Sequence, residues 1–161
     1  MSEKILVGIV DDHRGIIDGY LYRFVQTPAI QVNFTLGYGA EIQQMLTEYK
    51  TDVLLLDIMV PTSPDNPRPY PILSIISEAL HQHPTLSIIV ITMFCEKSLI
   101  KEVMEAGASG YILKDDRESI NQLGEVISSV ASGKTYLSRS ALLSLDEKDS
   151  GSFWKIFKKE R

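Results

Sequence analysis

Short apolar runs alternate along this chain with longer segments whose apolar residues recur at helical spacing. The apolar runs cover residues 5–10, 30–36, 53–56, 86–92 and 110–114. The segments with helical spacing cover residues 13–26, 40–50, 72–83, 96–108 and 117–133. Strands that alternate with amphipathic helices favour a parallel sheet with helices on both of its faces. The sequence therefore predicts an α/β fold with a doubly wound, five-stranded parallel sheet.

Polar residues stand at the C-terminal ends of four of these five runs. They are Asp11 and Asp12 after the first run, Asp57 after the third, Thr92 at the end of the fourth, and Lys114 at the end of the fifth. In open parallel sheets the carboxyl ends of the strands meet at one edge, where ligands bind. The five polar side chains are therefore predicted to lie close together.

Three neighbouring carboxylates repel one another unless something compensates their charge. At an effective dielectric constant of about 20, two charges about 4 Å apart interact with roughly 4 kcal/mol. A hard divalent cation relieves this repulsion, and Mg²⁺ prefers oxygen ligands while keeping several of its waters. Asp11, Asp12 and Asp57 are therefore candidate ligands of Mg²⁺.

Four motifs with this spacing together resemble the receiver domain of bacterial two-component response regulators, over residues 4–133. They are IVDDH at 9–13, LLLDIMVP at 54–61, VITMF at 90–94 and GASGYILKD at 107–115. The segments DDH and GYILKD resemble the LuxR/NarL-type subfamily of transcription regulators. The resemblance implies a flavodoxin-like fold with strand order 2-1-3-4-5.

The resemblance also implies a role for each of the site residues. The implied ligands of Mg²⁺ are Asp11, Asp12, Asp57 and the backbone carbonyl of Met59. The implied catalytic residues are Asp57 as the nucleophile that accepts a phosphoryl group, Lys114 as a compensating cation and Thr92 as a hydroxyl donor. The implied switch residues are Thr92 and Tyr111.

Each of these residues also has an ordinary structural interpretation. An acid after a strand is often a turn or N-cap residue. Thr92 is a good strand former, Lys114 suits a solvated strand end, and Tyr111 suits simple packing. His13 is expected to be a surface residue at a helix start, although it follows the two acids directly.

The segment PTSPDNPRPYP at 61–71 departs from the family pattern. It contains five of the seven prolines and no glycine, so no regular element is expected in it. It is expected to be an insertion over the site. It is either a tolerated surface segment or a semi-rigid flap that affects kinase docking or screens the phosphoryl group from water.

The chain is predicted to divide into a receiver domain at 1–133 and a C-terminal extension or linker at 134–161. The segment 138–145 is expected to form one or two helical turns with Ser138 as the cap, followed by a linker at 146–152. Residues 151–161 carry a net charge of +3 and the rest of the chain −8. The acidic body is a poor candidate for binding phosphate backbones, so DNA contacts are expected only through an output domain absent from this chain.

The predicted function is that of a phosphorylatable receiver that accepts a phosphoryl group from a sensor histidine kinase and forms homodimers on phosphorylation. It is not expected to be an enzyme beyond its own phosphotransfer and slow dephosphorylation. A single cysteine and the absence of a signal peptide or membrane-length apolar run fit a cytoplasmic protein.

Three alternatives remain open at this point. The first is a stand-alone or degenerate receiver that acts as an interaction module. The second is an aspartyl-phosphate hydrolase of the haloacid-dehalogenase type, which needs an acid where Met59 stands. The third is a nucleotide-binding flavodoxin-like protein, which needs a glycine-rich loop where Asp11 and Asp12 stand.

Overall fold

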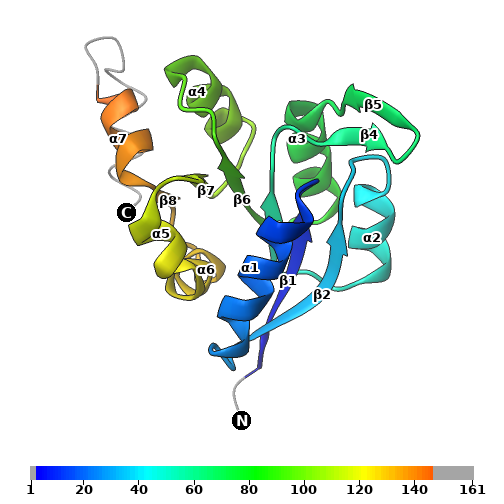
Figure 1. The fold of residues 1–161 in the computed structure, drawn as a ribbon, viewed down its shortest axis with the longest axis horizontal. Helices are drawn as coiled ribbons and strands as arrows, with labels where there is room; N and C mark the ends of the chain where they lie inside the picture. Colours follow the sequence, from blue (N-terminus) through cyan, green and yellow to red (C-terminus); the bar gives the residue numbers. More distant parts are fainter. Residues whose placement is uncertain (1–2, 147–161) are drawn as a thin grey trace.

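The computed structural model describes residues 3–146 and contains one parallel sheet of six strands (Figure 1). The strands, in spatial order, are β2 (Ile30–Leu36), β1 (Ile5–Val10), β3 (Val53–Leu56), β6 (Ser87–Thr92), β7 (Gly110–Leu113) and β8 (Tyr136–Leu137). All five neighbouring pairs are parallel. The expected order of the first five strands is confirmed, and β8 adds a sixth strand at the edge beside β7.

Helices cover both faces of this sheet, as the apolar runs predict. Successive residues of β3 point to opposite faces, so Val53 and Leu55 belong to one apolar cluster while Leu54 and Leu56 belong to the other. The first face is covered by α1 (Arg14–Val25) and α6 (Leu123–Ala131). The second face is covered by α2 (Ile42–Glu48), α3 (Ile72–Gln82), α4 (Lys97–Glu105) and α7 (Arg139–Leu145). Burial on both sides explains why β3 has no polar position.

The expectation of no regular element in the proline-rich segment is wrong. Residues of this segment form an antiparallel hairpin of β4 (Pro61–Ser63) and β5 (Asn66–Pro69). Proline is tolerated in such a ribbon because two strands alone leave many backbone N–H positions without a ladder partner. Here Pro61 lies opposite Pro69, and the Thr62 hydroxyl donates a hydrogen bond of 2.7 Å to the carbonyl of Arg68. A side-chain bond thus supports a ladder that the prolines weaken.

The single helix expected over 117–133 is interrupted. The structure contains α5 (Arg117–Asn121) and then α6, which are separated by Gln122 with φ −101° and ψ 17°. The Asp116 carboxylate caps α5 by accepting a hydrogen bond of 3.2 Å from the backbone N–H of Ser119.

Residues 134–146 pack on the same core as the preceding elements. β8 pairs with β7, and α7 lies beside α4, with Ala141 and Leu145 fully buried (Figure 1). Ser138 is the N-cap residue of α7, as expected, but its hydroxyl accepts a hydrogen bond of 3.2 Å from the N–H of Leu113 instead of capping the helix. The division of the chain at residue 133 stays a prediction. In the described residues, β8 and α7 follow this position and pack on the receiver core.

The expected linker at 146–152 lies outside the described residues except for Asp146, and the basic end of the chain lies outside them entirely. Among residues 3–146, no helix is long and apolar enough to cross a membrane.

The packing of α7 predicts that it contributes to stability. Leu145→Ala should lower the free energy of unfolding by about 2–5 kcal/mol, because the side chain is fully buried and its removal leaves a cavity. Leu143→Ala in the same helix is the control, since Leu143 is 62% exposed and its loss should change stability by less than about 0.5 kcal/mol. Urea denaturation measures both values. Equal values for the two variants would contradict the packing described for α7.

Candidate functional site

Asp11 and Asp57 lie at the C-terminal edge of the sheet, each fixed by a backbone hydrogen bond to a neighbouring strand. The N–H of Asp11 donates to the carbonyl of Leu36 at 3.0 Å, and the N–H of Asp57 donates to that of Val10 at 2.9 Å. Their exposures are only 2% and 5%. The strands therefore hold two carboxylates in place where a loop would let them separate.

Lys114 joins these two carboxylates. Its Nζ lies 2.8 Å from Oδ2 of Asp11 and 3.0 Å from Oδ2 of Asp57, and its side chain is 8% exposed. Burial alone would lower the pKa of Lys114, but the hydrogen bonds and charges of the two aspartates raise it above the ordinary value. The ammonium group therefore remains charged at neutral pH.

Asp12 and His13 complete the cluster on its solvent side. The backbone N–H of His13 donates to Oδ1 of Asp11 at 2.9 Å, and its Nδ1 lies 3.1 Å from Oδ1 of Asp12. The His13 side chain is 69% exposed, so the expectation of a surface residue at the helix start is confirmed. Its closeness to both acids, which its place directly after them in the sequence indicates, is also confirmed, because Nδ1 lies 3.4 Å from Oδ1 of Asp11 as well.

The donor set of this cluster suits a hard divalent cation. Asp11, Asp12, His13 and Asp57 each offer a ligand atom, and these atoms lie within 4.8 Å of one another. Lys114 contacts Oδ2 of Asp11 and of Asp57, while Oδ1 of each accepts one backbone N–H and keeps a lone pair for a further partner. Three carboxylates against one ammonium leave a negative site with oxygen donors, which is the environment that Mg²⁺ prefers.

Met59 lies next to the nucleophile candidate. Its backbone N–H donates to Oδ1 of Asp57 at 3.3 Å, while its side chain is exposed. The segment after β3 therefore turns back over the carboxylate. A ligand role for the Met59 carbonyl stays a prediction.

Thr92 and Tyr111 are both fully buried and both bond to the segment between β6 and α4. The Thr92 hydroxyl accepts a hydrogen bond of 3.4 Å from the N–H of Phe94, and the Tyr111 hydroxyl donates one of 2.5 Å to the carbonyl of Phe94. Burial raises the pKa of Tyr111, so its hydroxyl keeps the donated proton. The complete burial of Tyr111 agrees with a packing role, and the switch role of both residues stays a prediction.

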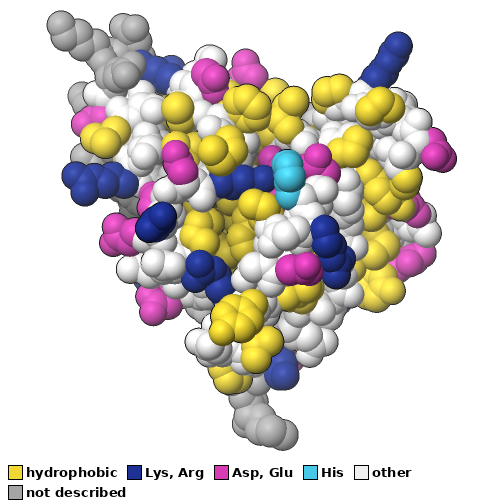
Figure 2. Space-filling model, in the orientation of Figure 1, with side chains coloured by type: hydrophobic (Ala, Val, Ile, Leu, Met, Phe, Trp, Pro, Cys, Tyr) yellow, Lys and Arg dark blue, Asp and Glu magenta, His cyan; other side chains and the backbone are white. Residues whose placement is uncertain are grey.

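Two cavities lie on the surface beside the segment that follows Asp57, and Met59 lines both. One of about 460 Å³ lies against the start of α4 and is lined by Ile58, Met59, Phe94, Glu96, Leu99 and Glu102, with Ser98. The other, of about 280 Å³, lies under the hairpin and is lined by Asp12, Met59, Val60, Pro61, Pro67 and Pro69. Figure 2 shows hydrophobic side chains gathered over α4 and the hairpin along the upper edge of the view. The charged site is therefore bordered by apolar surface.

Comparisons of the sequence identify a matching family and a similar protein. Residues 7–125 match the family described as the response regulator receiver domain. The oxygen regulatory protein NreC of Staphylococcus aureus strain JH9 is 31% identical over 137 residues, which cover 85% of this chain and 59% of NreC. The chain thus spans about three fifths of the length of this relative.

Comparisons of the structure identify the same fold. The isolated receiver domain of RcsB from Salmonella enterica serovar Typhimurium has a TM-score of 0.74 at 21% identity, over 86% of this chain and 96% of that one. A LuxR-family two-component response regulator from Aurantimonas sp. SI85-9A1 has a TM-score of 0.76 at 20% identity, over 89% and 96% of the two chains.

The family match extends from β1 into α6 and includes every residue of the acidic cluster and Lys114. The strand order of the sheet agrees with the fold that the resemblance implied. The chain belongs to the response regulator receiver domain family.

Proposed function

We propose that this chain accepts a phosphoryl group on Asp57 from a sensor histidine kinase, in a reaction that depends on Mg²⁺. The observation that carries the proposal is the buried contact of Lys114 with both Asp11 and Asp57 inside the acidic cluster. A buried lysine placed between two carboxylates is a charge that can be redirected onto an incoming anion.

The proposed reaction is a displacement at phosphorus. A carboxylate oxygen of Asp57 forms the new P–O bond, while the P–N bond of the phosphohistidine donor breaks and its imidazole keeps the electron pair. Lys114 exchanges a carboxylate oxygen for a phosphoryl oxygen and so compensates charge that spreads over the phosphoryl group. Asp11, Asp12, Asp57 and the carbonyl of Met59 would hold Mg²⁺, which would supply further positive charge at these oxygens.

Thr92 and Tyr111 are proposed to transmit the effect of Asp57 phosphorylation to the segment that leads into α4. In this proposal the Thr92 hydroxyl, at the end of the neighbouring strand β6, donates to a phosphoryl oxygen on Asp57. Phe94 bonds to both Thr92 and Tyr111, so a shift of Thr92 alters the segment that leads into α4. Both proposed switch residues thus bond to the backbone of the same residue, Thr92 to the N–H of Phe94 and Tyr111 to its carbonyl.

The cellular role proposed is that of the input half of a cytoplasmic two-component transcription regulator. The relative NreC is a regulatory protein longer than this chain, and another neighbour is described as RcsB dimers bound to DNA. We propose that phosphorylation here favours a homodimer and that DNA is bound only through an output domain not in this chain. A stand-alone receiver that acts as an interaction module is the alternative. The hydrolase alternative is disfavoured because Met59 cannot serve as a general acid.

Phosphorylation at Asp57 can be tested with a small phosphodonor. Incubation with acetyl phosphate and Mg²⁺ should add one phosphoryl group to the wild-type chain and none to Asp57→Ala, as measured by intact mass spectrometry. Asp18→Ala is the control, because this exposed acid on α1 pairs with Arg14 and lies outside the cluster. A phosphoryl group that is still added to Asp57→Ala would overturn the assignment of Asp57 as the nucleophile.

Binding of Mg²⁺ should stabilise the folded chain, because the ion binds the assembled cluster and not the unfolded state. At about 100 times its Kd, the ion should add about 2.7 kcal/mol to the free energy of unfolding. Asp12→Ala should lose most of this increment in a thermal melt with and without Mg²⁺, whereas Asp18→Ala should keep it. An Asp12→Ala variant that responds like the wild type would show that the site is misassigned.

Lys114→Ala should separate metal binding from phosphotransfer. Removing the ammonium group leaves the carboxylates more negative, so Mg²⁺ should bind at least as tightly in calorimetry. Phosphorylation by acetyl phosphate should slow by about a hundredfold, because a charge that compensates the transition state is lost. Lys134→Ala, at an exposed position, is the control. An unchanged phosphorylation rate in Lys114→Ala would contradict the proposed role.

A further inference from the structure

The β4–β5 hairpin is continuous with the segment that carries Met59. β4 begins at Pro61, two residues after Met59 and four after Asp57. Whatever fixes the hairpin therefore also restricts the backbone that leaves the acidic cluster.

Two backbone hydrogen bonds attach β4 to the loop that precedes α2. The N–H of Gly39 donates to the carbonyl of Pro61 at 2.9 Å, and the N–H of Ala40 donates to the carbonyl of Thr62 at 2.8 Å. These bonds extend from a segment that follows β2, far from the hairpin in sequence. The hairpin is therefore attached to the domain and is not a free flap.

The residue after the hairpin provides a second attachment. The ring of Tyr70 lies directly on Gly39, where an added Cβ would be 2.1 Å from the Tyr70 Cγ. The N–H of Tyr70 donates to the carbonyl of Val60 at 3.0 Å, and Val60 itself is buried. Glycine is required at 39 for this close approach, and the contact locks both ends of the hairpin against the domain.

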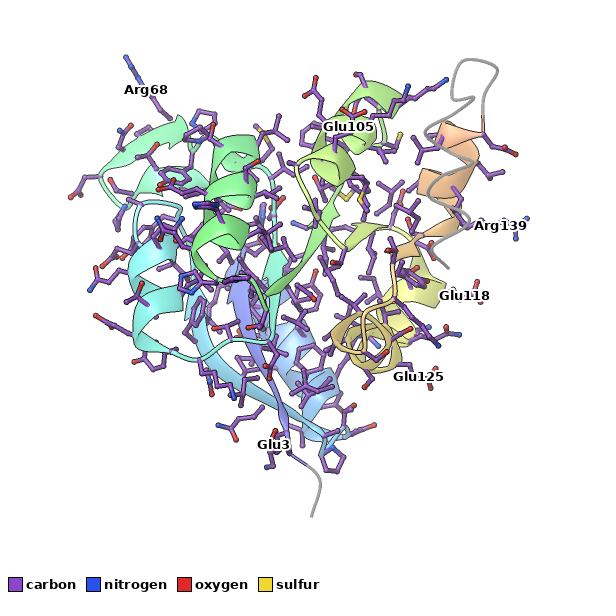
Figure 3. The ribbon with its side chains drawn as sticks, turned by 180° about the vertical axis from the view of Figure 1, so that it is seen from behind. Glu3, Arg68, Glu105, Glu118, Glu125 and Arg139 are labelled. Carbon is purple, nitrogen blue, oxygen red and sulfur yellow. The ribbon has the colours of Figure 1, made fainter. Side chains whose placement is uncertain are left out.

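The hairpin is also stiff within itself. The N–H of Arg68 donates to Oδ1 of Asn66 at 3.1 Å, and the flanking prolines at 67 and 69 reduce the number of conformations that the strand can adopt. In Figure 3 the Arg68 side chain points away from the molecule into solvent, so this side chain takes no part in holding the hairpin. The attachment depends on the root of the hairpin and not on its tip.

Met59 thus lies between two fixed points. On one side, its N–H bonds to Asp57, whose own N–H is held by Val10. On the other side, the carbonyl of Val60 is held by Tyr70. The cavity under the hairpin brings Asp12 together with Met59 and Pro67, so the hairpin faces the same side of the cluster as the proposed metal.

From this arrangement we infer that the hairpin braces the Met59 carbonyl for the divalent cation, with Tyr70 and Gly39 as positioning residues. A carbonyl held in place before the ion arrives loses little freedom on binding, so the brace raises the affinity of the site for Mg²⁺. The inference rests on the proposed function, since it requires that Mg²⁺ binds the acidic cluster.

The test compares Mg²⁺ affinity in variants of Tyr70 by isothermal titration calorimetry on the full chain. Tyr70→Ala should bind Mg²⁺ about tenfold more weakly than the wild type, as for other groups that hold a metal ligand in place. Tyr70→Phe keeps the ring on Gly39 and should restore the affinity. If Tyr70→Ala lowers only the melting temperature in the absence of metal and leaves the affinity unchanged, the brace is refuted.

Gly39→Ala provides an independent variant, because its methyl group displaces the ring without removing it. It should weaken Mg²⁺ binding as Tyr70→Ala does, and saturating Mg²⁺ should restore phosphorylation of Asp57 by acetyl phosphate in both variants. Arg68→Ser, which removes a hairpin side chain that points into solvent, should bind Mg²⁺ like the wild type. A wild-type chain without measurable affinity would overturn the proposed function itself, whereas equal affinities in the wild type and both root variants would overturn only the brace.

Discussion

The contact of one lysine ammonium with two buried carboxylates is the interaction on which the site depends. Asp11 and Asp57 come from neighbouring strands, and without a cation between them their repulsion would oppose the pairing of β1 with β3 at that edge. Lys114 follows β7, which is separated from β3 by β6, so it reaches across a strand to make the contact. The sheet brings the three charges together. The attraction of the ammonium group for both carboxylates helps to hold the ends of β1, β3 and β7 in place.

The burial of this lysine has a second effect, which concerns exchange of partners. Because its ammonium group already contacts oxygen atoms, an arriving anion replaces one oxygen ligand by another and does not have to strip water from an isolated charge. A fixed charge with little reorganisation is the arrangement that stabilises a transition state most effectively. The same contact therefore supports the fold in the resting chain and the chemistry proposed for it.

Much of the fold follows from the sequence because its signals are local and unambiguous. The run from Val53 to Leu56 has no polar position and is short, which favours a strand buried on both faces, and Asp57 then lies at the sheet edge. The hairpin could not be predicted, because a proline count does not reveal which N–H groups a two-stranded ribbon needs. The tertiary bonds of Gly39 and Ala40 to it join segments distant in sequence, and no local pattern encodes them.

The attachment of Ser138 links the end of the described chain to the interior of the domain. The backbone N–H of this buried residue donates to the carbonyl of Tyr111, and its hydroxyl accepts from the N–H of Leu113. The start of α7 is therefore bonded to β7 at two positions. Lys114 comes directly after Leu113, where β7 ends. If Lys114 moved and β7 moved with it, α7 would therefore tilt as a rigid body. The C-terminal end of α7 would then be displaced further than β7 itself, and the packing of α7 beside α4 would change.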